Sequence, residues 1–272
     1  MPRSCRSLLL ILLTAAAAPA AARAQSLWLD PAGAGGFQLE FLHPSVDGYS
    51  AASGAVFFGL RAPLGRRVAL VGELPVAHGD IRVGVGGVEL RGEAVTPGNP
   101  WIGVEIGSPG SDLQVALGGR IALIDSVDAA TSIGFLADPI DRPEAFLAQT
   151  GSLTARVIWR GFDDAGRGVL LHGGVSGWIP TDDGETVLQG SYGARLALAG
   201  PVVSAVAGIT GRANLSADDR SLAERTLHQL GLAVALELGP LRPGAEIRFH
   251  LDENFRDGTD WVLGLFVALR TS

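Results

Sequence analysis

The chain has 272 residues, a formal net charge of −7, 38 glycines and no lysine. The negative net charge argues against a nucleic-acid partner, because binding to phosphates needs a basic surface. Its only cysteine is Cys5, so neither a disulfide framework nor a cysteine-based metal site is expected.

The first 24 residues have the features of a secretory signal peptide. Arg3 and Arg6 precede an apolar stretch from Leu8 to Ala18, and residues 22–24 form a small-x-small cleavage pattern. The apolar stretch is shorter than the ~20 residues that a spanning helix needs. We therefore predict a signal peptide over residues 1–24 and one domain over residues 25–272.

Along the rest of the chain, apolar and polar residues alternate with period two between clusters of Gly, Pro and Asp, which predicts strands. About twelve such segments can be counted: 36–42, 53–63, 66–76, 99–107, 112–124, 151–160, 168–178, 187–198, 202–214, 226–238, 242–251 and 260–270. Several connections are short, at 63–65, 108–111, 199–201 and 239–241, and the connections between these are longer. Short turns alternating with long loops are typical of outer-membrane barrels.

The predicted fold is therefore all-β, a closed antiparallel up-and-down transmembrane β-barrel in a bacterial outer membrane, with both termini on the periplasmic side. A secreted β-sandwich or a periplasmic barrel also alternates, but its strands average ~5–6 residues, whereas many runs here reach the ~9–11 needed to cross a bilayer. Four tryptophans lie near predicted strand ends, as in an aromatic girdle: Trp101, Trp159, Trp178 and Trp261.

The charged residues of the strands share one parity, which assigns them to the lumen, because an arginine facing lipid at mid-bilayer costs ~2–4 kcal/mol. The predicted lumen-lining residues are Gln38, Glu40, Arg61, Glu73, Glu105, Gln114, Arg120, Arg156, Arg160, Gln189, Arg195, Arg212, Gln229, Glu237, Glu246 and Arg248. Such an interior is as compatible with a narrow polar pore as with a network that fills the barrel. Its mixed charge predicts weak ion selectivity at most.

The longest predicted loop, residues 125–150, contains a candidate constriction formed by Phe135, Arg142 and Phe146. Arg142–Leu147 is a candidate short helix, with Pro143 in its first turn. The favoured alternative is a loop that packs on the rim of the barrel, because long loops often carry some structure of their own. A second short helix is predicted over residues 216–225.

The segment from Thr96 to Glu105, with Gly98-Asn99-Pro100 at its start, resembles the Gly-Asn/Asp-Pro-x-x-Gly strand start of outer-membrane transporter-like barrels. These include families grouped with hydrocarbon or phenol-degradation transporters. The resemblance covers about ten residues and implies a transport barrel. The C-terminus departs from the aromatic final residue usual in such barrels, because the chain ends on Ser272.

The expected function is a passive channel or transporter for a small solute, and the alternative is a plugged structural or ligand-binding barrel with functional loops. A hydrolase at the outer rim, using His250 and Asp252, is less favoured because no catalytic motif surrounds these residues. The chain is therefore predicted not to be an enzyme and to need no metal or cofactor. Outer-membrane lipid, lipopolysaccharide and the barrel-assembly machinery are its expected partners.

Overall fold

The computed structural model describes residues 35–85, 88–107, 112–217, 221–256 and 258–271. The predicted signal peptide and the predicted turn at 108–111 lie outside the described residues. No helix in the described part of the chain is long and apolar enough to cross a membrane.

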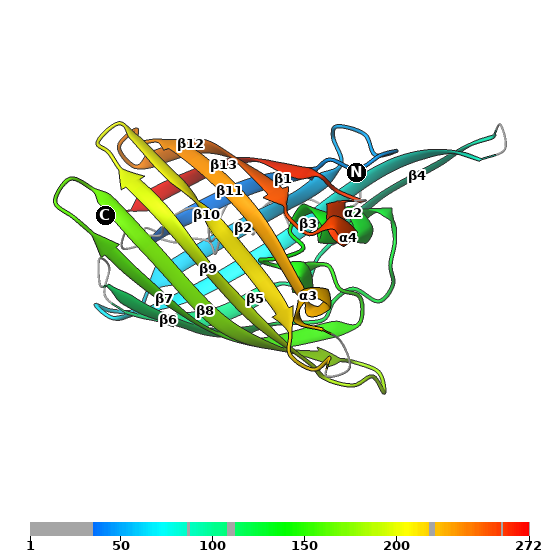
Figure 1. Cartoon of the computed structure of the whole chain (residues 1–272), viewed down its shortest axis with the longest axis horizontal. Helices are drawn as coiled ribbons and strands as arrows, with labels where there is room; N and C mark the ends of the chain where they lie inside the picture. Colours follow the sequence, from blue (N-terminus) through cyan, green and yellow to red (C-terminus); the bar gives the residue numbers. More distant parts are fainter. Residues whose placement is uncertain (1–34, 86–87, 108–111, 218–220, 257, 272) are drawn as a thin grey trace, which may run out of the picture.

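The chain forms a closed antiparallel barrel of twelve strands, which confirms the predicted fold class (Figure 1). Each strand pairs with the next along the chain, β1 pairs with β13, and β3 pairs with β2 and β5. The barrel strands are β1 (Gly35–Pro44), β2 (Gly54–Pro63), β3 (Val68–Val85), β5 (Trp101–Ile106), β6 (Leu113–Arg120), β7 (Thr150–Phe162), β8 (Arg167–Pro180), β9 (Val187–Ala199), β10 (Val203–Asn214), β11 (Thr226–Leu236), β12 (Leu241–His250) and β13 (Trp261–Thr271).

Polar and small residues face the inside of this barrel, and large apolar residues face outward. In β11, Gln229 and Ala233 are buried, whereas Leu230 and Leu232 are 49% and 46% exposed. This is the reverse of a water-soluble sandwich, whose apolar face is buried. The outward apolar surface matches the lipid-facing band of a transmembrane barrel.

The two rims of the barrel differ. At one rim, here called the short-turn rim, brief connections such as residues 64–67 and 163–166 join the strands. At the other, the long-loop rim, the connections are longer and carry the short helices α3 (Leu222–Arg225) and α4 (Glu253–Arg256). Helix α3 begins after Ser221, within the segment where a second helix was predicted.

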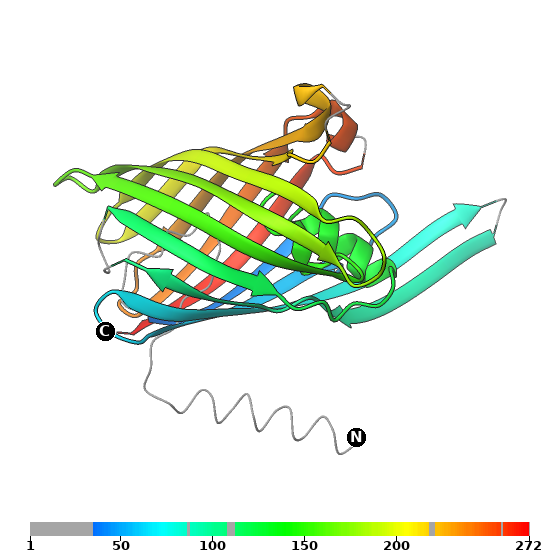
Figure 2. The same cartoon turned by 90° about the horizontal axis from the view of Figure 1, so that it is seen from below.

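One segment predicted as a long loop, residues 77–98, is instead mostly β-structure. β3 continues to Val85 and pairs with β4 (Val88–Pro97) in a hairpin that projects beyond the long-loop rim (Figure 2). Alternation persists in this segment, since Asp80 and Arg82 flank Ile81, but its glycines disguised the strands as a loop. The prediction of an unstructured connection was wrong here.

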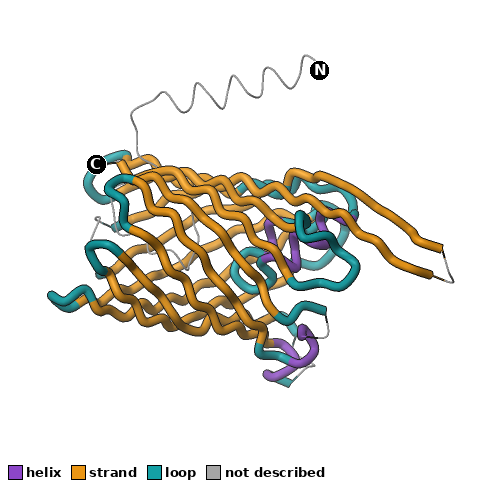
Figure 3. The backbone as a smooth tube through the Cα atoms, turned by 90° about the horizontal axis from the view of Figure 1, so that it is seen from above, coloured by secondary structure: helices purple, strands orange, loops and turns teal. Residues whose placement is uncertain are grey.

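The connection between β6 and β7, residues 121–149, turns back into the barrel and is here called the inward loop. It contains α2 (Ala129–Ala137) and a single 3₁₀ turn, η1 (Pro143–Ala145), both enclosed by the strands (Figure 3). The predicted helix over Arg142–Leu147 is thus only this turn, and α2 was not predicted. Asp128 caps α2 by accepting from the Thr131 backbone N–H at 2.7 Å.

Candidate functional site

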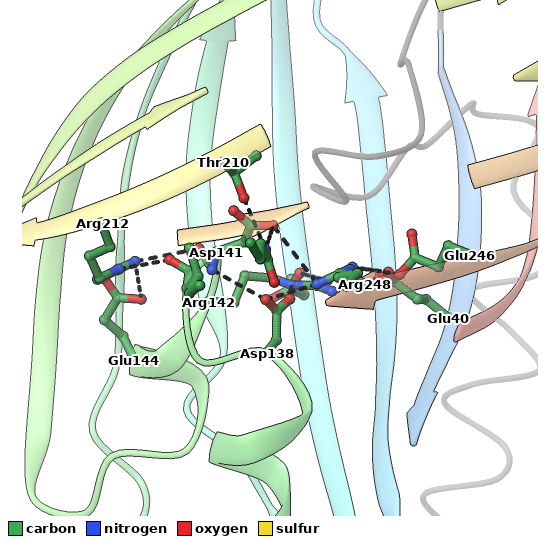
Figure 4. Close-up of polar contacts among 12 residues, drawn as sticks. Glu40, Asp138, Asp141, Arg142, Glu144, Thr210, Arg212, Glu246 and Arg248 are labelled. Atoms are coloured by element: carbon green, nitrogen blue, oxygen red, sulfur yellow. Dashed lines mark hydrogen bonds and ion pairs between the residues drawn. The ribbon is translucent and has the colours of Figure 1, made fainter. Parts of the chain in front are cut away.

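The inward loop is fixed to the barrel wall by a buried ionic network centred on Arg142 (Figure 4). The Arg142 guanidinium lies 2.8 Å from Glu40 of β1, 3.0 Å from Glu73 of β3 and 2.5 Å from Asp138 at the end of α2. All four side chains are at most 4% exposed. One loop arginine therefore links two wall carboxylates and one loop carboxylate, away from water.

Arg248 of β12 is the matching wall cation. Its guanidinium lies 3.0 Å from Asp138, 3.2 Å from Glu40 and 2.5 Å from Glu246. Glu40 and Asp138 thus each contact both Arg142 and Arg248, one from the loop and one from the wall. Glu40, Arg142, Asp138 and Arg248 thus form a closed ring of alternating charge, and their mutual attraction offsets the cost of removing them from water.

A second set of contacts holds η1 against β8 and β10. Arg212 of β10 lies 2.8 Å from the Glu144 carboxylate and donates to the backbone carbonyl of Ile140 at 2.8 Å. The Trp178 indole N–H of β8 donates to the same carboxylate at 2.8 Å. The segment from Asp138 to Glu144 is therefore bonded to β1, β3 and β12 and also to β8 and β10.

Asn99, at the entrance to β5, supports the backbone of the inward loop and is fully buried. Its side-chain amide donates to the carbonyls of Glu144 at 3.0 Å and Leu147 at 2.7 Å. Its side-chain oxygen accepts from the Leu123 backbone N–H at 2.8 Å. The residue that carried the resemblance to transporter barrels thus joins the two ends of the loop.

Apolar contacts complete the seat of the loop. Phe146 is buried and packs edge-on against Phe57 of β2, with ring centroids 5.9 Å apart. The Arg142 guanidinium lies over the ring of Phe57, 3.7 Å from its centroid. Phe135 is partly buried against the same cluster. The three residues of the predicted constriction are therefore all inside the barrel, not on its rim.

The sixteen predicted lumen-lining residues are nearly all buried inside the barrel. Fifteen of the sixteen are at most 9% exposed: Gln38, Glu40, Arg61, Glu73, Glu105, Gln114, Arg120, Arg156, Arg160, Gln189, Arg195, Arg212, Gln229, Glu246 and Arg248. Glu237 is the exception, because β11 ends at Leu236 and its side chain lies half-buried at the short-turn rim. The structure brings Glu40, Glu73, Arg212, Gln229 and Arg248 to the inward loop.

Space inside the barrel is unequally divided. Between the inward loop and β7–β10 lies a cavity of about 20 Å³, lined by residues that include Arg142, Arg156 and Arg212. That volume is enough for about one water molecule. At the short-turn rim a cavity of about 410 Å³ is lined by residues that include Ser204 and Arg242.

Several residues of the network were not singled out from the sequence. Asp138, Asp141 and Glu144 lie in a loop, where parity gives no orientation. Asn99 was named only as part of the strand start that resembles transporter barrels, and its contacts with the loop were not predicted. The spacing of Asp128 and Thr131 was the one available signal for α2, because a side chain at each position bonds the backbone of the other.

The tryptophan prediction needs correction. Trp101 is 4% exposed and its ring lies over Gly103 and Gly118, where a Cβ atom would come within 2.3 Å of it. Trp178 turns toward Glu144. Trp101 therefore packs inside the barrel against β5 and β6, and Trp178 supports the inward loop, whereas Trp159 is 43% exposed on the outer surface, as in a girdle.

The rim residues considered for hydrolysis are not paired as expected. His250 is 3% exposed, and its ring packs at a tilt against the Phe255 ring, with centroids 4.9 Å apart. Asp252 instead accepts from the backbone N–H of His228 and lies 3.2 Å from its Nδ1, while His228 Nε2 is 2.6 Å from the Tyr192 hydroxyl. The outer surface thus carries an Asp–His–Tyr chain of hydrogen bonds.

The loop carboxylates remain ionised to low pH. Burial alone would raise the pKa of Asp138, but the guanidiniums of Arg248 and Arg142 outweigh it and lower this pKa from 3.8 to about 2. Burial likewise opposes the ionised form of Glu144, and Arg212, aided by Trp178, lowers its pKa from 4.5 to about 2. Both groups therefore favour the seated loop when they are charged.

Acid is expected to release the inward loop. Because both pKa values are lower in the folded state, their stabilisation is complete above about pH 4.5 and is lost as the pH falls toward about 2. Near-UV circular dichroism should report this through Trp178, with a smaller acid change in Glu144→Gln. A spectrum that stays constant over this interval would contradict the expectation.

The amino-acid sequence matches no protein-family model and no curated protein. Solved structures are similar in fold. An outer membrane channel from Pseudomonas putida F1 has a TM-score of 0.60 at 14% identity, covering 92% of this chain and 99% of that one. LpxR from Salmonella typhimurium has a TM-score of 0.51 at 13% identity, covering 87% and 100%. The NanC porin has a TM-score of 0.50 at 5% identity, covering 86% and 100%. The chain is similar in fold to outer-membrane β-barrels.

The prediction that the chain is not an enzyme has to be corrected. LpxR is an outer-membrane enzyme, so barrels similar to this one include enzymes as well as a channel and a porin. The absence of a catalytic motif in the sequence therefore does not settle the class of function. Fold and function have to be argued separately.

Proposed function

We propose that this barrel is a passive outer-membrane channel for a small polar solute and that the inward loop is its constriction. The observation that carries the proposal is the position of the inward loop inside the barrel and its ionic contacts with the wall. The loop crosses the long-loop half of the lumen and is held by ionic contacts to β1, β3, β10 and β12. Similarity in fold to a channel and a porin supports the same class of function.

The lining favours a polar solute. Arginine, glutamate, glutamine and hydroxyl side chains occupy many inward positions of the barrel, and the buried apolar cluster that includes Phe57 and Phe146 is confined to the contact between the inward loop and the wall. The resemblance of the Gly98-Asn99-Pro100 segment to transporter barrels supports a channel. A hydrocarbon cargo fits the charged lining poorly, because desolvated charges gain nothing from an apolar solute.

Conductance across planar bilayers tests this proposal. The wild-type barrel should give a small conductance, and deletion of residues 130–148 should raise it severalfold, because the deletion removes α2 and η1 from the lumen. As a matched control, residues 82–91 of the projecting hairpin are replaced by an Asn-Gly turn, which should leave the conductance unchanged. Heat-modifiable gel mobility shows whether each variant is folded.

Two results would contradict the proposal. If neither the wild type nor the folded deletion variant conducts, the barrel is plugged by its wall side chains, and a structural or ligand-binding role takes precedence. If the two conduct equally, the inward loop is not the constriction.

A further inference from the structure

The balance of charge in the lumen changes along the barrel axis. In the long-loop half, six carboxylates (Glu40, Glu73, Glu246, Asp138, Asp141 and Glu144) are paired with four arginines (Arg120, Arg142, Arg212 and Arg248). Arginines dominate near the short-turn ends of the strands. Among the described residues these are Arg61, Arg160, Arg195, Arg242 and Arg270, against the two carboxylates Glu105 and Glu237.

The two carboxylates of this half are each neutralised by neighbours. Glu105 lies 2.5 Å from Arg61. Glu237 lies 2.9 Å from Arg242 and 2.8 Å from Arg270. The described residues of the short-turn half therefore carry three more arginines than carboxylates. This local excess is positive although the whole chain has a net charge of −7.

The inward charges also differ between the two sides of the barrel. Across β7 to β10, every charged side chain that is buried in the lumen and described is an arginine: Arg156, Arg160, Arg195 and Arg212. The buried carboxylates of the wall lie on β1, β3, β5 and β12. A low-dielectric wall of one sign concentrates ions of the opposite sign.

Arg156 connects this basic wall to the narrow cavity below the inward loop. Its side chain is 9% exposed, and among the described residues its Nε has no hydrogen-bond partner. It lines the cavity of about 20 Å³ together with neutral hydrogen-bonding side chains, including Thr154, Ser176 and Ser191. The charged lining consists of four arginines, Arg156 included, against the two carboxylates Asp141 and Glu144. A buried guanidinium facing a polar cavity is suited to donate hydrogen bonds to an anionic oxygen or a halide.

We propose that the short-turn half of the lumen selects anions and that the solute is a small anion, such as one carrying a carboxylate. This inference rests on the proposed channel function and names its class of solute. Arg156 binds the anion where the passage narrows, and the wall formed by Arg160 and Arg195 attracts it from the short-turn rim. The mixed composition of the lumen alone predicted weak ion selectivity. The excess of arginine in the short-turn half instead predicts a preference for anions.

The test is the reversal potential of the wild-type barrel in a planar bilayer under a gradient of potassium chloride, repeated with potassium acetate. We expect both anions to be more permeant than potassium. The double variant Arg156→Gln/Arg195→Gln should lower the anion-to-cation permeability ratio at least twofold. Arg156→Lys keeps the charge and should retain most of the preference.

The control is Arg167→Gln, which removes an exposed arginine from the short-turn rim and should leave the ratio unchanged. Heat-modifiable mobility verifies folding of each variant. A current that prefers potassium, or a ratio that the double variant does not change, overturns this inference and leaves the channel function intact. The absence of any current overturns the channel function and this inference with it.

Discussion

Replacement of Arg142 by methionine is expected to destabilise the folded barrel by about 3–5 kcal/mol and to raise its conductance. Methionine keeps much of the length of the side chain but removes the cation from Glu40, Glu73 and Asp138. These carboxylates would keep Arg120 and Arg248 as partners, yet each would lose one buried counter-charge. The inward loop would lose its main contact with β1 and β3.

Chemical unfolding followed by heat-modifiable gel mobility measures the stability, and planar-bilayer recording measures the conductance. The chain provides a matched control in Arg167, which pairs with Asp163 at the same four-residue spacing as Arg142 with Asp138. That pair is exposed, so Arg167→Met should change neither quantity. Equal effects of the two replacements would mean that burial of the network contributes nothing.

Replacement of Asn99 by aspartate is the second change with a large expected effect. It removes the amide that donates to the carbonyls of Glu144 and Leu147 and places a carboxylate beside them. Each buried group left unsatisfied costs about 1–3 kcal/mol, so the combined loss should be several kcal/mol. The loop backbone at η1 should then become accessible to amide hydrogen exchange.

Asn214→Asp is the control for this experiment. Asn214 uses its side-chain oxygen to accept from the Ser216 backbone N–H near the surface, and aspartate can still accept that bond. The two variants make the same chemical change, but Asn99→Asp removes hydrogen bonds that the amide donates, whereas Asn214→Asp keeps the one that the oxygen accepts. If Asn99→Asp exchanges its loop amides no faster than the wild type, the supporting role assigned to Asn99 is wrong.

The barrel itself could be predicted because the two faces of each strand meet different surroundings, lipid on one side and the polar lumen on the other. In a strand that faces lipid on one side, a charged residue is costly on that side, so the parity of arginine and glutamate gives the orientation of the strand. Arg156 and Arg248 were assigned to the lumen by this argument alone. The same argument identifies no partners, so it could not show that Arg248 contacts Asp138 rather than a residue of a neighbouring strand.

The inward loop was less accessible to such reasoning. The segment Ala129–Ala137 is apolar on most of its surface because it is enclosed by the barrel, and it therefore lacks the amphipathic pattern that marks a surface helix. The loop was expected to pack on the rim, since long loops often carry some structure of their own. What seats it inside is the complementary charge of Glu40, Glu73 and Arg248, which only the closed barrel brings together.

The projecting hairpin limits how deeply the barrel can sit in the bilayer. β3 has 18 residues, whereas about 9–11 suffice to cross. From Val76 onward it pairs with β4, which in the described chain has no second neighbouring strand. An open strand edge cannot lie in hydrocarbon, because its backbone N–H and C=O groups would find no partner there. The apolar layer on this side must therefore end at or before Val76, near the level of Trp101 at the start of β5.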